Sequence, residues 1–405
     1  MKIHKTVKPV FVSKFQCVGP DCLMSCCRGW SIFIDKKTHH KYLTADNKEI
    51  ATIAKENLIL LRKGKNQYSR IKLDQHGDCP FMAENKLCTV HREMGESALS
   101  RTCSIYPRLE QKYEDETRHC MTLSCPEVVR LALFDPEGMM LHEQEELLAH
   151  HKTNLIGKRQ SAGQVQQVIH LFSWHLLQSD SLNVEENLMA LAQFILCLQK
   201  YNFDLHNHFT QVEDFYHALL NELHSGRTLI DKRHSASATK LKLQALAVMG
   251  THVASDSQRD NFTLEGHRLI SDWFDITNQN DLNLQGEKFA AINLQWEKVC
   301  ATSCLAEPHV LRNYLLYKIY NGYFPGKDTA TILRQFYRIV LDFYYIKVFL
   351  SVKSMHQEVD QTMVMKTIAS FSQRTMHNTA IDARLNHIIN KINGGDDLSA
   401  LLLIG

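Results

Sequence analysis

Cysteine is the residue whose type and spacing point most directly to chemistry in this chain. Nine of the twelve cysteines lie between Cys17 and Cys125, in a tight group that reads C-x4-C-x3-C-C and a second, looser group. Crowded thiols indicate either disulfide bonds or thiolate ligands of a metal ion or cluster. The first group is Cys17, Cys22, Cys26 and Cys27, and the second is Cys79, Cys88, Cys103, Cys120 and Cys125.

The start of the chain favours metal binding over disulfides. It reads MKIHKTVKPVFVSKFQC and holds no apolar run long enough for the core of a signal peptide. We therefore expect a cytosolic protein, whose thiols are kept reduced. The odd number of cysteines in the two groups also fits disulfides less well. Disulfides remain the alternative interpretation.

The spacing leaves the identity of the metal open. Structural zinc sites usually show paired C-x2-C knuckles, and no such pair occurs among the nine cysteines. Thiolate-rich sites also suit iron–sulfur clusters, which need about four thiolates. The other thiols would then be buried, form a second site or have no ligand role. The candidate ligands are Cys17, Cys22, Cys26, Cys27, Cys79, Cys88, Cys103 and Cys125.

Other candidate groups carry a weaker signal. His76, His91 and His119 lie near the cysteines in sequence, but without paired spacing each is expected to be an ordinary surface or core histidine. Cys197 falls on an apolar helix face and is expected in the core. Cys300 and Cys304 are one helical turn apart, and packing is again the expectation. The chain has no GxGxxG, phosphate-loop or GxSxG motif.

Composition predicts a globular, mainly α protein. The chain has 405 residues, 44% of them hydrophobic, a net charge of +2, 8 prolines and 17 glycines. The charge balance argues against nucleic-acid binding, which would need a marked basic excess. The sequence changes character near Pro126, where cysteines become rare. We predict a cysteine-rich, loop-rich metal or cluster domain over 1–130 and an all-α domain over 131–405.

The elements expected in the first domain are short. Residues 8–12 are predicted to form a strand, and 17–30 a loop with a turn at Gly19. Asp35 is expected to cap a helix that ends near Leu43. Further helices are expected over 51–64 and 93–99, a strand over 66–76, a hairpin-like loop between Cys79 and Cys88, and a helix starting at Pro126. Cysteines would then lie on loops and helix ends, where distant thiolates can converge.

The second domain shows helical periodicity throughout. Asn183 is expected to cap a helix, and Thr210 with Glu213 matches a capping box. Gly226 is a plausible helix stop. Residues 384–393 repeat the apolar pattern. The region is expected to hold roughly eight to ten helices.

The segment 329–352 is long, aromatic and apolar, yet it carries charges. Arg334, Arg338 and Asp342 recur at helical spacing, and Lys347 follows. A charge near the centre of a bilayer costs about 2.5–3.5 kcal/mol. We therefore expect a buried helix with one polar stripe and no transmembrane segment. A helix lying on the membrane surface, and thus peripheral association, is the alternative.

The motifs around the cysteines resemble a known family. The C-x3-C-C group, followed by GDCPF, LCTVH and CSIYPR, is similar to the cysteine-rich zinc- or iron-chelating family of bacterial proteins over residues 17–125. Over its whole length the chain resembles the flagellin lysine N-methylase family. That resemblance implies S-adenosylmethionine as methyl donor, a 4Fe-4S cluster on the thiols, flagellin as protein substrate and a bacterial cytoplasmic location. Zinc and mononuclear iron remain the alternatives to the cluster.

Methylation of lysine sets chemical requirements on the site. The amine has a pKa near 10.4 and must lose a proton before it attacks a methyl sulfonium. Tyr106, Tyr113 and Glu127 lie near the cysteines and are candidate proton acceptors. Radical enzymes usually show C-x3-C-x2-C, but Gly29 stands where the third cysteine would be. The competing hypothesis is a structural zinc or iron module whose helical scaffold binds a partner without catalysis.

Overall fold

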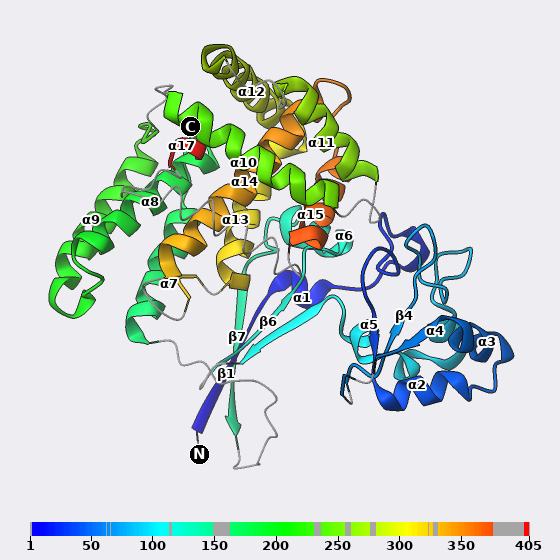
Figure 1. The fold of residues 1–405 in the computed structure, drawn as a ribbon. Helices are drawn as coiled ribbons and strands as arrows, with labels where there is room; N and C mark the ends of the chain where they lie inside the picture. The colour runs from blue at the N-terminus through cyan, green and yellow to red at the C-terminus, as the bar shows by residue number, and fades with distance from the viewer. Residues whose placement is uncertain are drawn as a thin grey trace.

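The computed structural model describes most of the chain as two lobes (Figure 1). The described residues are 2–61, 63–64, 66–112, 116–148, 163–230, 236–255, 261–275, 281–322, 324–326, 331–375 and 401–404. Helices dominate these residues, and the strands lie before residue 149, so the mainly α fold class is confirmed. We call residues 17–106 the cysteine lobe and the rest of the described chain the main body.

A four-stranded sheet opens the main body. Its strands are β1 (Lys2–Pro9), β5 (Arg108–Lys112), β6 (Glu116–Met121) and β7 (Leu141–Leu148), in the order β5-β6-β1-β7. Strand β1 runs parallel to β6 and antiparallel to β7. The basic β1 faces the acidic β7, and Lys5 Nζ lies 2.7 Å from Glu143 Oε2. Opposite charges on neighbouring strands favour this pairing.

The packing does not follow the predicted boundary at residue 130. The larger core includes Val7 and Phe11, which precede the cysteines, and Met121 and Val128, which follow them. Strand β7 lies in the region predicted to be all helical. Because β1 pairs with β6 and β7, the segments on both sides of the cysteine lobe return to one sheet.

The cysteine lobe has a small core of its own. Its strands β2 (Phe33–Ile34), β3 (Leu58–Leu60) and β4 (Ser69–Ile71) form a sheet in the order β2-β4-β3. Apolar side chains including Ile32, Ile50 and Phe81 fill the space beneath it. Around them lie η1 (Gly19–Asp21), α2 (Lys36–Leu43), α3 (Lys48–Asn57), α4 (Thr89–Met94), η2 (Glu96–Ala98) and α5 (Arg101–Ile105).

Local signals in this lobe were partly confirmed. Asp35 caps α2, and its side chain accepts a hydrogen bond from the Thr38 N–H at 2.9 Å. The predicted strand over 8–12 is wrong in its second half, because α1 (Val10–Lys14) begins there. The helix predicted over 51–64 ends at Asn57, where β3 takes over. The helix predicted over 93–99 is broken at Gly95, whose φ of +78° a helix cannot accommodate.

The helices of the main body surround α14 (Ile332–Ser354), which packs against α8, α11, α12 and α15. The helix is buried along nearly its whole length, as predicted. Asp342 is fully buried and pairs with Lys318 at 2.5 Å and with Arg338 at 3.1 Å. The other helices are α6 (Pro126–Leu133), α7 (Gln164–Gln178), α8 (Val184–Lys200), α9 (Leu205–His224), α10 (Ala236–Ser255), α11 (Asn261–Phe274), α12 (Leu282–Thr302), η3 (Cys304–Ala306), α13 (Pro308–Gly322), α15 (Gln361–Thr375) and α17 (Leu401–Ile404).

Two capping predictions had opposite outcomes. Asn183 caps α8 as predicted, accepting from the Glu186 N–H at 3.1 Å. The capping box at Thr210 is wrong, because α9 already begins at Leu205 with Asp204 as its cap. The expected stop at Gly226 is confirmed, with φ of +69° just after the helix. The helix expected over 384–393 lies outside the described residues.

The lengths and hydrophobicity of the described helices bear on the prediction of no transmembrane segment. Among them, none is both long enough and apolar enough to cross a bilayer.

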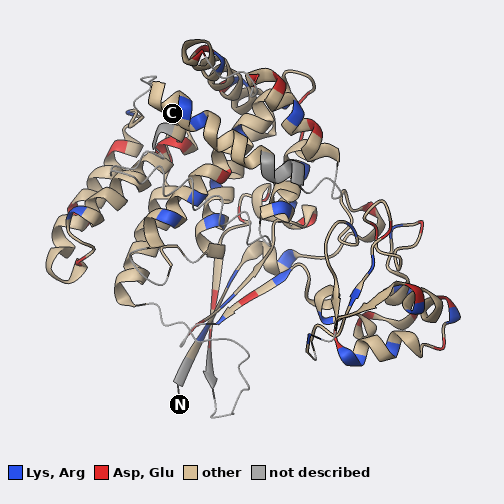
Figure 2. Cartoon of the chain, viewed as in Figure 1, with Lys and Arg blue, Asp and Glu red and all other residues tan. Residues whose placement is uncertain are grey.

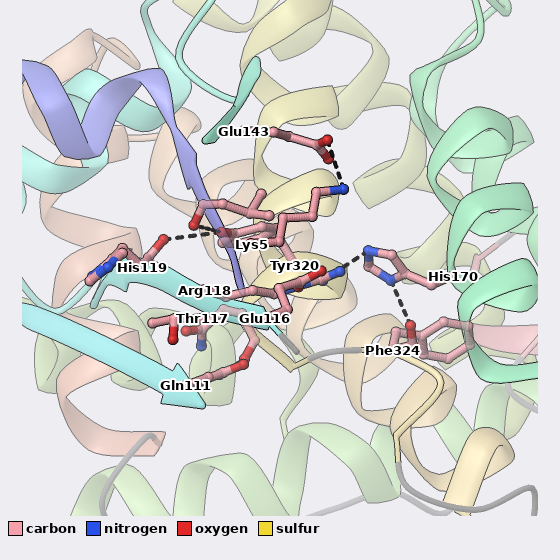
Figure 3. A network of polar contacts seen from close by, with 12 residues as sticks. Lys5, Gln111, Glu116, Thr117, Arg118, His119, Glu143, His170, Tyr320 and Phe324 are labelled. Atoms are coloured by element: carbon pink, nitrogen blue, oxygen red, sulfur yellow. Dashed lines mark hydrogen bonds and ion pairs between the residues drawn. The ribbon is translucent and has the colours of Figure 1, made fainter. Parts of the chain in front are cut away.

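A polar network joins the sheet to the helices (Figure 3). Arg118 of β6 pairs with Glu116 and lies 3.1 Å from His170 Nε2 of α7. His170 Nδ1 in turn lies 2.7 Å from the Phe324 carbonyl oxygen. The Tyr320 hydroxyl donates to the carbonyl oxygens of Val7 and His119, at 3.0 and 3.1 Å. Helices α7 and α13 are thereby fixed to one face of the sheet.

Candidate functional site

The two cysteine groups meet within the cysteine lobe. Backbone hydrogen bonds join the loop around Cys27 to the loop around Cys79, including a 2.8 Å bond from the Cys79 N–H to the Cys27 carbonyl oxygen. Beside it, Arg28 makes a bidentate pair with Asp78 at 2.6 and 2.7 Å. Two segments about fifty positions apart are therefore held together by these contacts, without a bound metal.

The second group approaches the same place from two further segments. Met82 and Cys88 form a β-bridge that closes the expected hairpin-like loop. Cys103 sits in α5, and its N–H donates to Ser100 Oγ at 3.2 Å. Cys79 is buried in the small core, and Cys88 and Cys103 pack against that core. Local turns and helix caps thus bring cysteines from several elements to the small core of the cysteine lobe.

Cys26 and its neighbour Cys27 are at the centre of this convergence. The Cys27 thiol donates a hydrogen bond to Cys26, which lowers the pKa of Cys26 and raises that of Cys27. Burial raises the pKa of Cys79 to about 12 and that of Cys103 to about 11, and neighbouring thiols contribute to both shifts. Thiols that raise one another's pKa lie near one another, and a bound cation would remove the repulsion between their thiolates.

Backbone donors oppose the cost of burying some thiolates. Cys88 and Cys125 are the N-cap residues of α4 and α6. Burial raises the pKa of both thiols, that of Cys125 to about 12, while backbone N–H groups of the following helical turn act in the opposite direction. Helix-start N–H groups stabilise negative sulfur. The expectation that the cysteines lie on loops and helix ends is confirmed for Cys88 and Cys125, whereas Cys120 lies within strand β6.

The remaining predicted ligands are placed differently. Burial raises the pKa of Cys22 and Cys125, Cys26 raises both further, and Cys22 adds to the shift of Cys125. Cys17 is exposed. Cys120 was not among the predicted ligands, and it lies in the larger core, where its thiol donates to the Met121 carbonyl oxygen at 3.7 Å.

The donor set fits a thiolate-bound metal or cluster in type and number. Five thiols converge, those of Cys26, Cys27, Cys79, Cys88 and Cys103. Within the described residues, however, no three histidine, cysteine or acidic side chains are already grouped as metal ligands. The geometry of coordination is therefore not fixed in advance, and the ligand assignment stays a prediction.

The histidines near the cysteines in sequence have other surroundings. His76 is exposed, with its Nε2 3.2 Å from Gln75. His91 is exposed on α4, and His119 lies on β6 in the main body. These positions agree with the expectation of ordinary histidines.

The other cysteines were expected in packing roles. Cys197, Cys300 and Cys304 are partly buried and pack against the larger core. That expectation is confirmed.

A groove of 740 Å³ borders the thiols on one side. Trp30 and Tyr106 line it, with ring centroids 5.6 Å apart. The indole N–H of Trp30 donates to the Cys26 carbonyl oxygen at 2.6 Å. The Tyr106 hydroxyl lies 3.1 Å from Ser124 Oγ and interacts electrostatically with Cys26. These two aromatic residues therefore separate the groove from the thiols.

A second cavity of 380 Å³ lies between the lobes. Cys22, Met24 and Arg28 line it from the cysteine lobe, and Phe262 and Lys366 from α11 and α15. Two contacts close its ends: Ser370 Oγ lies 3.6 Å from Met24 Sδ, and Gln373 Nε2 donates to the Ser124 carbonyl oxygen at 3.0 Å. Cys22 therefore faces the cavity between the lobes, whereas the loop of Cys26 lies beside the groove that Trp30 lines.

Only part of this arrangement was predicted from the sequence. Tyr106 and Glu127 were candidates, but Glu127 is held by Arg130 at 2.6 Å, and Tyr113 lies outside the described residues. Trp30 was missed; its position four residues after Cys26 in the first cysteine loop was the available signal.

Comparisons with known proteins identify the family of the chain. A model of the FliB lysine N-methylase C-terminal domain matches residues 170–404. A protein named Lysine-N-methylase from Salmonella typhimurium is 30% identical over 407 residues and covers 100% of both chains, and one from Salmonella choleraesuis is equally similar. The flagellar biosynthetic protein FliU of Salmonella muenchen is 42% identical over 151 residues, which are 37% of this chain and 89% of that protein. No solved structure matches. The chain therefore belongs to the FliB lysine N-methylase family.

Proposed function

We propose that this protein is an S-adenosylmethionine-dependent protein-lysine N-methyltransferase that acts on flagellin and carries an iron–sulfur cluster on its thiols. The observation that carries the proposal is the 30% identity over the full length to a protein named Lysine-N-methylase. The flagellar substrate is supported by the name of the relative FliU. The cluster is supported by the converging thiols described above.

The cluster would be held by four of the converging thiols, Cys26, Cys27, Cys79, Cys88 and Cys103. When bound, it would supply either a structural clamp between the loops or a redox centre next to the methyl donor. A loaded metal would also keep these thiols deprotonated against the effect of burial.

The residues around the groove would favour the neutral form of the substrate lysine amine, although none of them is available as a strong general base. Burial raises the pKa of Tyr106 well above its usual value, so its phenol keeps its proton and is a hydrogen-bond donor. Glu127 is engaged with Arg130. Desolvation against the apolar wall would lower the pKa of the incoming amine, which would release its proton to water on entry.

The smaller cavity is our proposed site for the methyl donor. It borders Cys22, and Lys366 and Phe262 offer a cation and a ring to a ligand with a carboxylate and an adenine. Changing Lys366→Ala should raise the KM for the donor and leave the KM for flagellin unchanged. An unchanged donor KM would remove this cavity from the proposal.

The central experiment uses protein purified without oxygen. We expect transfer of isotope-labelled methyl groups from S-adenosylmethionine to lysines of purified flagellin, measured by mass spectrometry, together with iron and acid-labile sulfide in the protein. Cys27→Ser should lose both the metal and the transfer, whereas Cys197→Ser should keep both. Zinc without sulfide and no transfer would instead support the non-catalytic metal module.

A further inference from the structure

The larger groove has an apolar wall that is open to solvent. It lies between the cysteine lobe and β5, at the edge of the main sheet. Trp30, Phe33, Tyr106 and Leu109 line it, together with Ile105, whose side chain is 44% exposed. An exposed apolar surface of this kind marks a place where another chain can be bound.

The rim of the groove is basic. Lys36 and Lys37 begin α2, Arg101 begins α5 and Arg108 begins β5, and all of them are exposed. No ion pair joins any of these cations to a carboxylate in the part of the chain that the structure describes. Lys36 and Arg108 lie instead over the rings of Tyr68 and Phe15, at 5.8 and 5.7 Å. Figure 2 shows α2 with basic and without acidic residues.

The one carboxylate in the lining, that of Asp35, offsets only one of these four positive charges. Asp35 Oδ2 accepts from the Thr38 hydroxyl at 2.5 Å, and Oδ1 accepts from the Thr38 N–H at 2.9 Å. Both oxygens thus cap the N-terminus of α2. The groove is therefore complementary to an acidic ligand with apolar side chains.

The edge of the sheet offers backbone groups to such a ligand. The Thr122 N–H donates to the Pro107 carbonyl oxygen at 2.9 Å, and Arg108 is paired with Met121 in the register of β5 and β6. Inward and outward backbone groups alternate along an antiparallel strand. The N–H and C=O of Arg108 are therefore directed away from β6, toward the open side. A polypeptide fits this edge better than a compact small molecule does.

We propose that the groove binds an extended segment of the protein substrate, one that presents carboxylates to the basic rim and apolar side chains to the wall. The proposal rests on the proposed function, because it gives that activity its protein-binding site. Trp30 lines the groove, and its indole N–H donates to the Cys26 carbonyl oxygen at 2.6 Å, so the groove lies beside the loop that carries Cys26 and Cys27. A lysine carried by, or next to, the bound segment is held close to the thiol centre.

The first test measures binding alone. A fluorescein-labelled peptide of alternating leucine and glutamate is titrated with the purified holoprotein and followed by fluorescence anisotropy. We expect the acidic peptide to bind and a leucine–lysine peptide not to bind. The double variant Lys36→Glu/Lys37→Glu should weaken binding by about tenfold or more, because two attractions become repulsions. Lys48→Glu/Lys55→Glu, exposed on α3 away from the groove, changes the net charge equally and should bind as wild type does.

The second test uses the apolar wall and the substrate. Ile105→Ser should raise the KM for flagellin and leave the KM for S-adenosylmethionine unchanged. Leu60→Ser, 46% exposed on β3 and outside the groove, is its matched control. Equal weakening by both double variants, no binding of the acidic peptide, or a rise in the donor KM alone would overturn the assignment of the groove.

The two tests separate this inference from the proposed function. Peptide binding requires no methyl transfer, so binding without transfer would refute the methyltransferase and leave the groove assigned. If Lys36→Glu/Lys37→Glu methylates flagellin with an unchanged KM for flagellin, the groove is not the binding site of the protein substrate. The methyltransferase proposal would be unaffected by that result.

Discussion

The indole N–H of Trp30 donates a 2.6 Å hydrogen bond to the backbone carbonyl oxygen of Cys26. This bond fixes the loop that carries the two adjacent thiols to the wall of the groove. Trp30 also contacts the ring of Tyr106. Trp30 therefore connects the loop that carries Cys26 and Cys27 to the wall of the groove.

Replacing Trp30 by phenylalanine should separate these roles. Trp30→Phe keeps an aromatic ring at the wall but leaves the Cys26 carbonyl oxygen without this donor. We expect the free energy of unfolding to fall by about 1 kcal/mol and the iron content to drop, measured by urea denaturation and metal analysis. Trp273→Phe is the matched control, because the indole nitrogen of Trp273 has no hydrogen-bond partner within the described structure. If both variants lose the same amount of iron, the Trp30 bond has no special role in the site.

Two buried cysteines should respond oppositely to the same substitution. Cys79 lies in the small core among other thiols, whereas Cys120 lies in the larger core beside Tyr317. Cys79→Ser should lose most of the metal, and Cys120→Ser should retain it with some loss of stability. Iron, sulfide and zinc content per chain, together with circular dichroism, would check this. Retention of metal in Cys79→Ser would remove that residue from the ligand set.

The features that the sequence predicted are those decided by neighbouring residues. Asp35 and Asn183 cap helices with side chains that reach only three residues ahead. The Thr210 pattern failed because Asp204 offers an equally good cap upstream, and the chain starts its helix there. Local propensity cannot rank two such caps, since the packing of the helix decides between them.

The features that the sequence could not predict depend on distant partners. A helix starting at Pro126 was predicted, but the position of its cap residue Cys125 near Cys22, about a hundred positions earlier in the chain, was not. The pairing of β1 with β7 brings Lys5 next to Glu143, although the whole cysteine lobe lies between them in the sequence. The groove likewise needs residues 30–40 and 101–109 at the same place. Register and packing between remote segments determine these contacts.

His170 should make the stability of the protein depend on pH. Burial and the nearby charge of Arg118 lower the pKa of this histidine to about 4, from 6.5. A lowered histidine pKa means that the neutral form is stabilised in the folded state. The contribution of neutral His170 to the free energy of unfolding is complete above pH 6.5 and is lost as the pH falls toward 4. It amounts to roughly 3 kcal/mol.

The check is a comparison of urea unfolding at several pH values between wild type and His170→Asn. The amide can still donate to the Phe324 carbonyl oxygen but does not titrate, so the fall in stability below neutral pH should be shallower in the variant. His91→Gln, at an exposed position on α4, should show the wild-type slope. Parallel curves for wild type and His170→Asn would contradict the assigned protonation state.

Asp342 should be among the most sensitive positions for stability. Its carboxylate is fully buried in α14 and pairs with Lys318 and Arg338, so Asp342→Asn removes the negative charge from both of these ion pairs. We expect a loss of about 3–5 kcal/mol in the free energy of unfolding, seen as a lower denaturation midpoint. Asp180→Asn removes a carboxylate that is 87% exposed and pairs with Arg312 at 2.9 Å. That control should cost less than about 1 kcal/mol. Similar losses in the two variants would show that burial does not govern the strength of the α14 pair.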